Sequence, residues 1–232
     1  MAILEAHGIH KTYESRGVET PALRGVDLAL DEGEFTVLHG PSGCGKTTLL
    51  NLLGALDTPS RGTVILDGED LSGLSSKAIA ALRLHKLGFV FQAYNLIPVL
   101  TARENVEFVM ELQGVPPGQR KDRSERFLGE VGLSDLADKR PMEMSGGQQQ
   151  RVAVARAIVG EPRVVLADEP TANVDSETAD HLLDIMEGLN RQRGVTFLFS
   201  THDPRVMERA RRVVRIVDGR VDSDETARSA AV

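Results

Sequence analysis

One short segment constrains the fold of this chain more than any other, the loop GPSGCGKT at residues 40–47. It follows an apolar run predicted to be a strand, Phe35 to Leu38, and precedes an apolar helical pattern, Leu49 to Leu56. A G-x-x-x-x-G-K-T pattern between a strand and a helix is typical of a phosphate-binding loop (P-loop). Glycines let the backbone N–H groups turn inward, and the helix start adds a positive end. The segment therefore predicts a site for phosphate oxygens.

The side chains of this loop have separate expected roles. The Lys46 ammonium reaches the β- and γ-phosphates, Thr47 offers its hydroxyl to Mg²⁺, and Thr48 is a weaker candidate for a phosphate contact. Cys44 occupies a variable position of the loop, and we expect it to pack rather than to act as a redox switch. The alternative for the whole segment is an ordinary glycine-rich turn. The predicted nucleotide contacts are Gly40, Ser42, Gly43, Gly45, Lys46, Thr47 and Thr48.

The composition favours a globular chain without a nucleic-acid partner. The 232 residues are 41% hydrophobic and 26% charged, which allows one domain with a sizeable core. The formal charge of -7 gives no broad basic field for a phosphate backbone, so we expect no nucleic acid among the partners. A single cysteine, a start without signal-peptide character and the lack of a long apolar run predict a cytoplasmic chain. Any membrane role would then come through a separate partner.

Apolar, β-branched runs separated by helical patterns predict a mainly parallel sheet of the α/β class. The runs are Phe35 to Leu38, Thr63 to Leu66, Val164 to Ala167 and Val195 to Phe199. Over residues 93–160 the apolar spacing is helical, and Thr101 with Glu104 has the form of a capping box, which predicts an inserted helical lobe. A hairpin is expected over Val213 to Val221, and the small, acidic residues 222–232 predict a poorly ordered tail.

Two adjacent carboxylates, Asp168 and Glu169, directly follow the continuously apolar strand Val164 to Ala167. Ligands of open α/β sheets gather at the carboxyl ends of such strands. Asp168 suits a metal-holding acid, directly or through a water, and Glu169 suits a general base that polarises the attacking water. Alone, an Asp-Glu pair is more often a solvated strand end. With the P-loop upstream, the catalytic interpretation is favoured.

The segment Ser145-Gly-Gly-Gln-Gln-Gln150, which leads into Arg151-Val-Ala-Val-Ala-Arg-Ala157, resembles the signature motif of the ATP-binding cassette (ABC) family. Ser145 can cap a helix whose glycines permit close backbone approach, so that a positive helix start meets a γ-phosphate. In that family the motif serves the nucleotide of a second chain. The resemblance therefore implies a head-to-tail homodimer with ATP sandwiched between its halves. The nucleotide contacts it implies here are Ser145, Gly146, Gly147 and Gln148.

The resemblance covers the whole chain apart from the tail, and it implies a P-loop NTPase (RecA-like) α/β core with an antiparallel β subdomain and an inserted α-helical subdomain. It implies a single ABC ATP-binding domain over residues 1–232. The core then comprises 1–92 and 161–221, the helical subdomain with the signature motif 93–160, and the flexible tail 222–232.

Further family positions fall in order along the chain. Tyr13 resembles the aromatic residue that stacks on adenine, although a half-exposed strand residue explains it equally well. Gln92 resembles the glutamine that contacts Mg²⁺ and water, and Asp175 lies in a segment like the family's D-loop. His202 matches the histidine that contacts the γ-phosphate and supports hydrolysis; such a histidine is otherwise more often structural. Val174 in that D-loop-like segment departs from the leucine usual in the family.

Within the family, the segments at 49–57, 84–92 and 95–98 resemble the LolD and MacB group of bacterial ATPases. The resemblance implies an ATP- and Mg²⁺-dependent ATPase that powers an integral membrane permease of the MacB or LolC/E type, in lipoprotein release or in macrolide or peptide efflux. It implies a peripheral location on the cytoplasmic face of the inner membrane. The alternative is a regulatory ATPase like FtsE, which signals through a membrane partner without transport. A soluble ABC ATPase of repair or translation is disfavoured, because tandem cassettes, coiled coils and zinc-binding cysteines are lacking.

Overall fold

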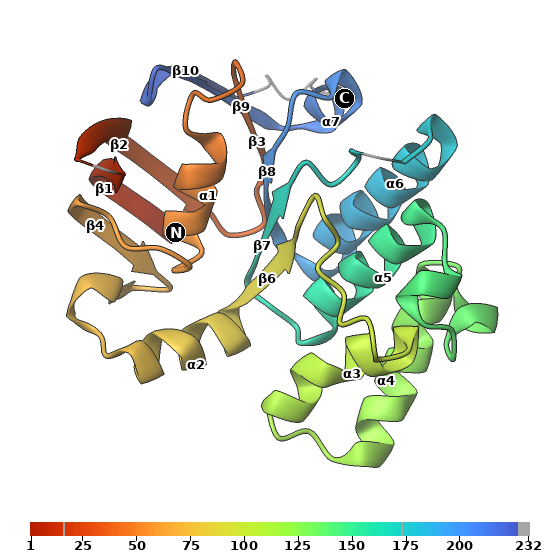
Figure 1. Ribbon diagram of the computed structural model, residues 1–232. Helices are drawn as coiled ribbons and strands as arrows, with labels where there is room; N and C mark the ends of the chain where they lie inside the picture. Colours follow the sequence, from red (N-terminus) through yellow and green to blue (C-terminus); the bar gives the residue numbers. More distant parts are fainter. Residues whose placement is uncertain (16, 173, 227–232) are drawn as a thin grey trace. The chain divides into compact units, whose positions relative to one another are not determined.

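The computed structural model describes residues 1–15, 17–172 and 174–226 (Figure 1). The described chain divides into two units, and each is treated by itself. The P-loop unit comprises Met1–Ala80 together with the chain from Thr196 onward, and the helical unit comprises Ala81–Val195. These boundaries differ from the expected subdomain limits at 93 and 160, because strands as well as helices belong to the helical unit.

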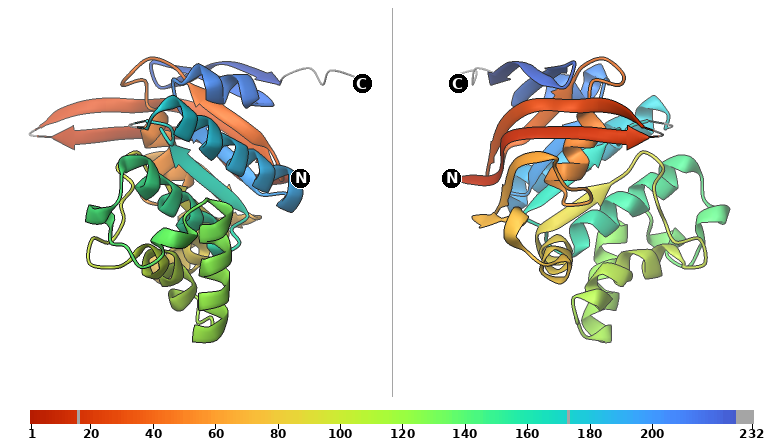
Figure 2. Two further views of the ribbon diagram at one scale, coloured as in Figure 1. Left: turned by 90° about the vertical axis from the view of Figure 1, so that its right-hand side faces the viewer. Right: turned by 60° about the vertical axis from the view of Figure 1, so that its left-hand side comes forward.

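An antiparallel sheet occupies the start of the P-loop unit, with the strand order β2-β1-β4-β5. Strands β1 (Ala2–Ser15) and β2 (Val18–Asp31) form the long paired ribbon visible in both views of Figure 2. Strand β4 (Arg61–Leu66) pairs with β1, and the short β5 (Glu69–Asp70) pairs with β4. The run Thr63 to Leu66 is thus a strand, but its expected place in a parallel sheet is wrong. Its apolar pattern does not specify the direction of its partner.

A second group of strands carries the P-loop. Strand β3 (Phe35–His39) lies parallel to both β8 (Thr196–Ser200) and β9 (Arg212–Val217). Phe35 is buried and its ring centroid lies 4.6 Å from that of Phe199. Such aromatic pairs contribute about 0.5–1.5 kcal/mol beyond their buried area. Strand β3, which leads into the P-loop, is therefore hydrogen-bonded to a neighbour on each edge and is also stabilised by aromatic packing.

Short helices complete the P-loop unit. Helix α1 (Lys46–Leu53) begins at the end of the P-loop, and α7 (Pro204–Arg209) follows β8. A short 3₁₀ turn lies at Leu71–Gly73, and α2 (Ser76–Lys86) runs from this unit into the next. The helix expected to continue to Leu56 ends at Leu53, because Gly54 caps it and Ala55 adopts a left-handed backbone with φ 52°.

The helical unit contains a parallel strand pair, β6 (Leu87–Val90) and β7 (Val164–Asp168), paired from Leu87 with Val164 to Val90 with Ala167. Every regular element between these strands is a helix or 3₁₀ turn, as predicted for the inserted lobe. The elements are α3 (Ala102–Leu112), α4 (Pro117–Glu130), 3₁₀ turns at Ser134–Leu136 and Pro141–Glu143, and α5 (Gly146–Val159). Figure 1 shows α3, α4 and α5 packed together. Helix α6 (Ser176–Arg193) follows β7.

The predicted capping box of α3 is confirmed. The Thr101 hydroxyl accepts a hydrogen bond from the Glu104 backbone N–H at 3.2 Å, and the Glu104 carboxylate accepts one from the Thr101 N–H at 2.7 Å. These two bonds satisfy backbone donors that the helix itself leaves open. The same bonds lower the pKa of the Glu104 carboxyl.

The predicted hairpin near the end of the chain is confirmed, but the expected disorder from residue 222 is wrong for its first part. Strand β10 (Arg220–Thr226) pairs with β9 along its length, from Val217 with Arg220 to Arg212 with Thr226. Arg212 donates to both Asp224 oxygens, at 2.8 and 2.7 Å, and to Glu34 at 3.0 Å. Asp224, which was expected to lie in a poorly ordered tail, therefore pairs with an arginine of the neighbouring strand. The remaining tail, 227–232, lies outside the described residues.

We expect Asp224→Asn to lower the free energy of unfolding at pH 7 by about 0.2–1 kcal/mol, because the ion pair is partly exposed. The hydrogen bond from Arg212 lowers the pKa of the Asp224 carboxyl. The contribution is therefore present above the unfolded-state pKa and is lost as the pH falls through the folded-state pKa. Urea titrations at neutral and acidic pH measure this. Asp222→Asn is the control, since its bond to Arg215 joins two more exposed side chains. Equal effects of the two substitutions at pH 7 would contradict the assignment.

Candidate functional site

The P-loop runs from β3 to α1 in close contact with neighbouring backbone. Gly40 has φ 152°, and a Cβ added there would lie 2.0 Å from the carbonyl oxygen of Ile216 on β9. Gly45 has φ 104°, and a Cβ there would lie 2.7 Å from the carbonyl oxygen of Ala22 on β2. No side chain can be accommodated at either position without moving the backbone. Glycine is thus required at these two positions by the packing of the loop, and an ordinary exposed turn does not account for that.

The loop places positive charge at the start of α1. Among the described residues, no side chain caps this helix, whose N-cap residue is Gly45. Backbone N–H groups at a helix start attract anions. The Lys46 ammonium lies over the same loop and donates to the carbonyls of Gly40 at 2.8 Å and Pro41 at 3.1 Å. Cys44 is buried, in agreement with the expected packing role. The arrangement suits a phosphate chain, with Ser42, Gly43, Thr47 and Thr48 on the same segment.

The other expected residues of the P-loop unit lie on different elements. Tyr13 is on β1, where its side chain is 41% exposed and its hydroxyl donates to Asp57 at 3.1 Å. The Lys11 ammonium lies 4.9 Å from the centre of the Tyr13 ring. Both a stacking aromatic and a half-exposed strand residue fit this position. His202 is exposed between β8 and α7.

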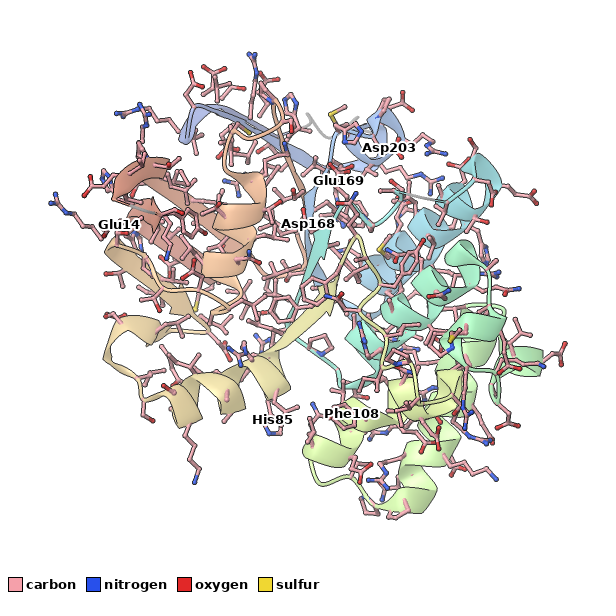
Figure 3. The ribbon with its side chains drawn as sticks, viewed as in Figure 1. Glu14, His85, Phe108, Asp168, Glu169 and Asp203 are labelled. Carbon is pink, nitrogen blue, oxygen red and sulfur yellow. The ribbon has the colours of Figure 1, made fainter. Side chains whose placement is uncertain are left out.

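The carboxylates of the helical unit lie at the end of a buried strand. Asp168 is the last residue of β7 and Glu169 follows it, as Figure 3 shows. Glu169 has φ 46°, a left-handed conformation that is uncommon outside glycine. Strained backbone of this kind is concentrated at functional sites, because the surrounding structure must hold it. The exposed Gln92 follows β6, whose parallel pairing with β7 brings the ends of both strands to one edge.

The start of α5 confirms the capping role predicted for Ser145. Its hydroxyl accepts from the Gln148 N–H at 3.3 Å, and the Gln148 side chain accepts from the Ser145 N–H at 2.8 Å. Gly146 and Gly147 form the first turn between them. A Cβ at Gly147 would lie 2.7 Å from Thr178 Cγ2, so the signature segment packs tightly against the start of α6.

The residue at the start of α6 is Asp175, the predicted D-loop acid. Its carboxylate accepts from the Thr178 N–H at 2.9 Å and from the Thr178 hydroxyl at 2.7 Å. These bonds, first of all the one from the backbone, lower the pKa of Asp175. Asp175 is thus the N-cap of α6, a role beyond the one predicted from its sequence position. Through Thr178, the structure brings Asp175 and the signature segment together. Asn173 of the same segment lies outside the described residues.

One residue of this region was not recognised from the sequence. Arg156 on α5 is half-buried, and its guanidinium donates to the backbone carbonyls of Asn95 at 2.5 Å and Tyr94 at 2.8 Å. Tyr94 and Asn95 have φ values of 60° and 49°, so this arginine holds a left-handed turn directly after Gln92. Burial lowers the pKa of Arg156. An arginine within a buried helical run is rare unless it is paired, and that pattern could have predicted a partner.

These features define a mixed α/β P-loop protein with antiparallel and parallel sheets. A family model described as ABC transporter matches residues 23–172. The match includes the P-loop, the signature segment, Asp168 and Glu169, but not Tyr13, Asp175 or His202. The chain belongs to the ABC transporter family, and it is an ATP-binding subunit, an ABC-type ATPase, of the LolD and MacB group.

Individual relatives agree with this assignment. The chain is 47% identical to the lipoprotein-releasing system ATP-binding protein LolD 1 of Rhodopseudomonas palustris, over 94% of this chain and 98% of that protein. It is 44% identical to the macrolide export ATP-binding/permease protein MacB of Syntrophobacter fumaroxidans, over 98% of this chain but 32% of that protein. Among solved structures, the chain is similar to a dimeric post-hydrolysis state of the ATP-binding cassette MJ0796 bound to ADP and Pi. The sequence identity is 38% and the TM-score is 0.92, and the match covers 97% of this chain and 99% of that one.

We expect Arg156→Lys to release the turn after Gln92, because an ammonium cannot reproduce the fork that reaches two carbonyls. The free energy of unfolding should fall by about 1–3 kcal/mol, as for hydrogen bonds to a charged group. Hydrogen exchange should accelerate at the amides of Tyr94 and Asn95, which now donate to backbone carbonyls of the turn. The control is Arg126→Lys on the exposed surface of α4. Unchanged exchange in the Arg156 variant would show that the turn does not depend on the guanidinium.

Proposed function

We propose that the chain works as a head-to-tail homodimer that binds two ATP molecules between its halves and powers a separate membrane permease. The observation that carries the proposal is the start of α5. Its capping box satisfies the N–H groups of Ser145 and Gln148 and leaves the first turn, Gly146–Gly147, as a positive helix start without side chains. Such an end suits the γ-phosphate of a nucleotide that another chain supplies.

The P-loop of each chain supplies the other half of this proposed site. The loop amides and Lys46 hold the β- and γ-phosphates, Tyr13 stacks on the adenine, and Ser145 to Gln148 of the second chain close over the nucleotide. Asp175 packs beside the signature segment through Thr178 and therefore belongs to the same dimer surface. The dimeric structure of MJ0796, similar over nearly the whole chain, supports this arrangement.

Hydrolysis in this proposal depends mainly on positioning and charge. Glu169 polarises the attacking water as general base, while Gln92 and His202 orient the water and the γ-phosphate. The residues present fit Mg²⁺, because the Thr47 hydroxyl, the Asp168 carboxylate and the Gln92 amide offer the oxygen ligands that Mg²⁺ prefers. When bound, Mg²⁺ neutralises charge that develops on the phosphates.

The partner is proposed to be an integral membrane permease of the LolC/E or MacB type. The name of the MacB relative describes a single protein that is both ATP-binding and permease, and this chain matches 32% of its length. A permease in a separate polypeptide would complete the same machine, with this chain on the cytoplasmic face of the inner membrane. Within the described residues, no helix is both long and apolar enough to cross a bilayer.

The LolD and MacB relatives favour transport over the FtsE-like regulatory role. Reconstitution separates the two, since only transport gives ATP-dependent movement of a ligand.

Glu169→Gln tests the general base. The amide keeps the shape but accepts no proton, so kcat for ATP hydrolysis should fall by about 10²–10⁴-fold. ATP binding should stay close to that of the parent protein, because the P-loop is unchanged. Glu187→Gln is the matched control, since it removes a carboxylate of α6 that pairs with Arg191. Near-normal turnover of the Glu169 variant would exclude Glu169 from this role.

Ser145→Arg tests the dimer. When hydrolysis is blocked by Glu169→Gln, light scattering with Mg-ATP should show a dimer, and without nucleotide it should show a monomer. Adding Ser145→Arg places a bulky side chain at the exposed start of α5 and should keep the protein monomeric with ATP bound. Ser134→Arg, on an exposed 3₁₀ turn of the same unit, is the control and should dimerise normally. Equal ATP-dependent dimers of both variants would refute the role of the signature segment.

A further inference from the structure

Gln150, in the second turn of α5, is fully buried, with 0% of its surface exposed. Its Nε2 donates a hydrogen bond of 2.8 Å to the backbone carbonyl of Pro170. Its Oε1 is also buried, and it meets no hydrogen-bond partner among the described residues. An unpaired buried acceptor costs stability, and an apolar side chain of the same shape would avoid that cost. The amide therefore carries a cost at its oxygen, while its nitrogen makes a specific bond to the Pro170 carbonyl.

The bond reaches the backbone that carries Glu169. Glu169 has φ 46° and precedes a proline, which restricts its backbone further. Its carbonyl accepts from the Ala172 N–H at 3.0 Å, so the segment is a tight turn. A strained conformation persists only where its surroundings hold it in place. Gln150 is a fixed donor that anchors this turn one residue after Glu169.

We propose that Gln150 is a positioning residue that sets the orientation of Glu169 through the Pro170 carbonyl. Gln150 lies on the same helix as Ser145, within its first turns. A shift of the start of α5 on closure over the γ-phosphate thus moves the Pro170 carbonyl and with it the carboxylate that activates water. The signature segment thereby influences the position of the hydrolytic water as well as contacting the phosphate. This inference rests on the proposed role of Glu169 as the general base.

Gln150→Met tests the inference, because methionine fills a similar volume and cannot donate. We expect kcat to fall by about 10- to 100-fold, as for a misplaced catalytic group. The dissociation constant for a fluorescent ATP analogue and the KM should change little, since the P-loop is untouched. Asn190→Leu is the matched control: it also removes a buried amide, which donates to the Val195 carbonyl at 2.7 Å. Its folded protein should keep the parent kcat. A Gln150→Met protein with parent kcat would overturn the proposal.

A double-mutant cycle separates this inference from the proposed function. If Gln150 acts through Glu169, adding Gln150→Met to Glu169→Gln should cause little further loss of kcat. If the two losses multiply in full, Gln150 acts by another route and the inference fails, while Glu169 keeps its role. If Glu169→Gln alone has normal turnover, the proposed function fails first.

Pro170→Ala covers the case in which Gln150→Met does not fold, as judged by circular dichroism. It leaves α5 intact and loosens the same turn by freeing the φ angle of residue 170. The same result is expected: a lower kcat, unchanged ATP affinity and no further loss in the Glu169→Gln background. An unchanged kcat in folded Pro170→Ala would count against the anchored turn.

Discussion

The conformation of the P-loop depends on the close approach of its backbone to two strands. Gly40 lies against the Ile216 carbonyl and Gly45 against the Ala22 carbonyl, at distances that exclude any Cβ. The end of the β9–β10 hairpin adds a further constraint, since the Gly219 N–H donates to the Cys44 carbonyl at 3.1 Å. Phosphate-binding N–H groups are effective only when their directions are fixed in advance. The strands around the loop provide that rigidity, so the whole P-loop unit contributes to the anion site.

Two helix starts use the same electrostatics in different ways. Helix α1 begins at a left-handed glycine, and its positive end is combined with the Lys46 ammonium. Helix α5 begins with a complete capping box, so its first turn is stable before any nucleotide arrives. The first arrangement suits a ligand that the chain binds by itself. The second suits contact with a phosphate that is already bound elsewhere, because a preformed surface loses little entropy on docking.

Local signals in the sequence predicted the strand β3, the strand β7, the hairpin of β9 and β10, the capping box of α3 and the N-cap Ser145 of α5 correctly. Each depends on residues close in sequence, such as Ser145 and Gln148. Long-range partners were not predictable in the same way. The antiparallel place of β4 and the ion pairs of Arg212 depend on which distant segments meet, and an acidic stretch looks the same as a tail or as a strand edge. The left-handed backbone of Glu169 was also not predictable from the sequence, since its neighbours Asp168 and Pro170 are compatible with other turns.

Two polar residues of α5, the half-buried Arg156 and the buried Gln150, connect these points to the proposed function. Arg156 and Gln150 project from one helix to the turns after β6 and β7, and those strands are parallel neighbours. Apolar residues at both positions would pack the helix without the cost of burying a guanidinium and an unpaired amide oxygen. A helix under selection for stability alone would lack them. Arg156 bonds to the left-handed Tyr94 and Asn95 after Gln92, and Gln150 bonds to the residue that follows the left-handed Glu169. A displacement of α5 would therefore act on both turns. The helix that begins with the signature segment therefore has the physical connections needed to link the proposed dimer closure to the proposed activation of water by Glu169.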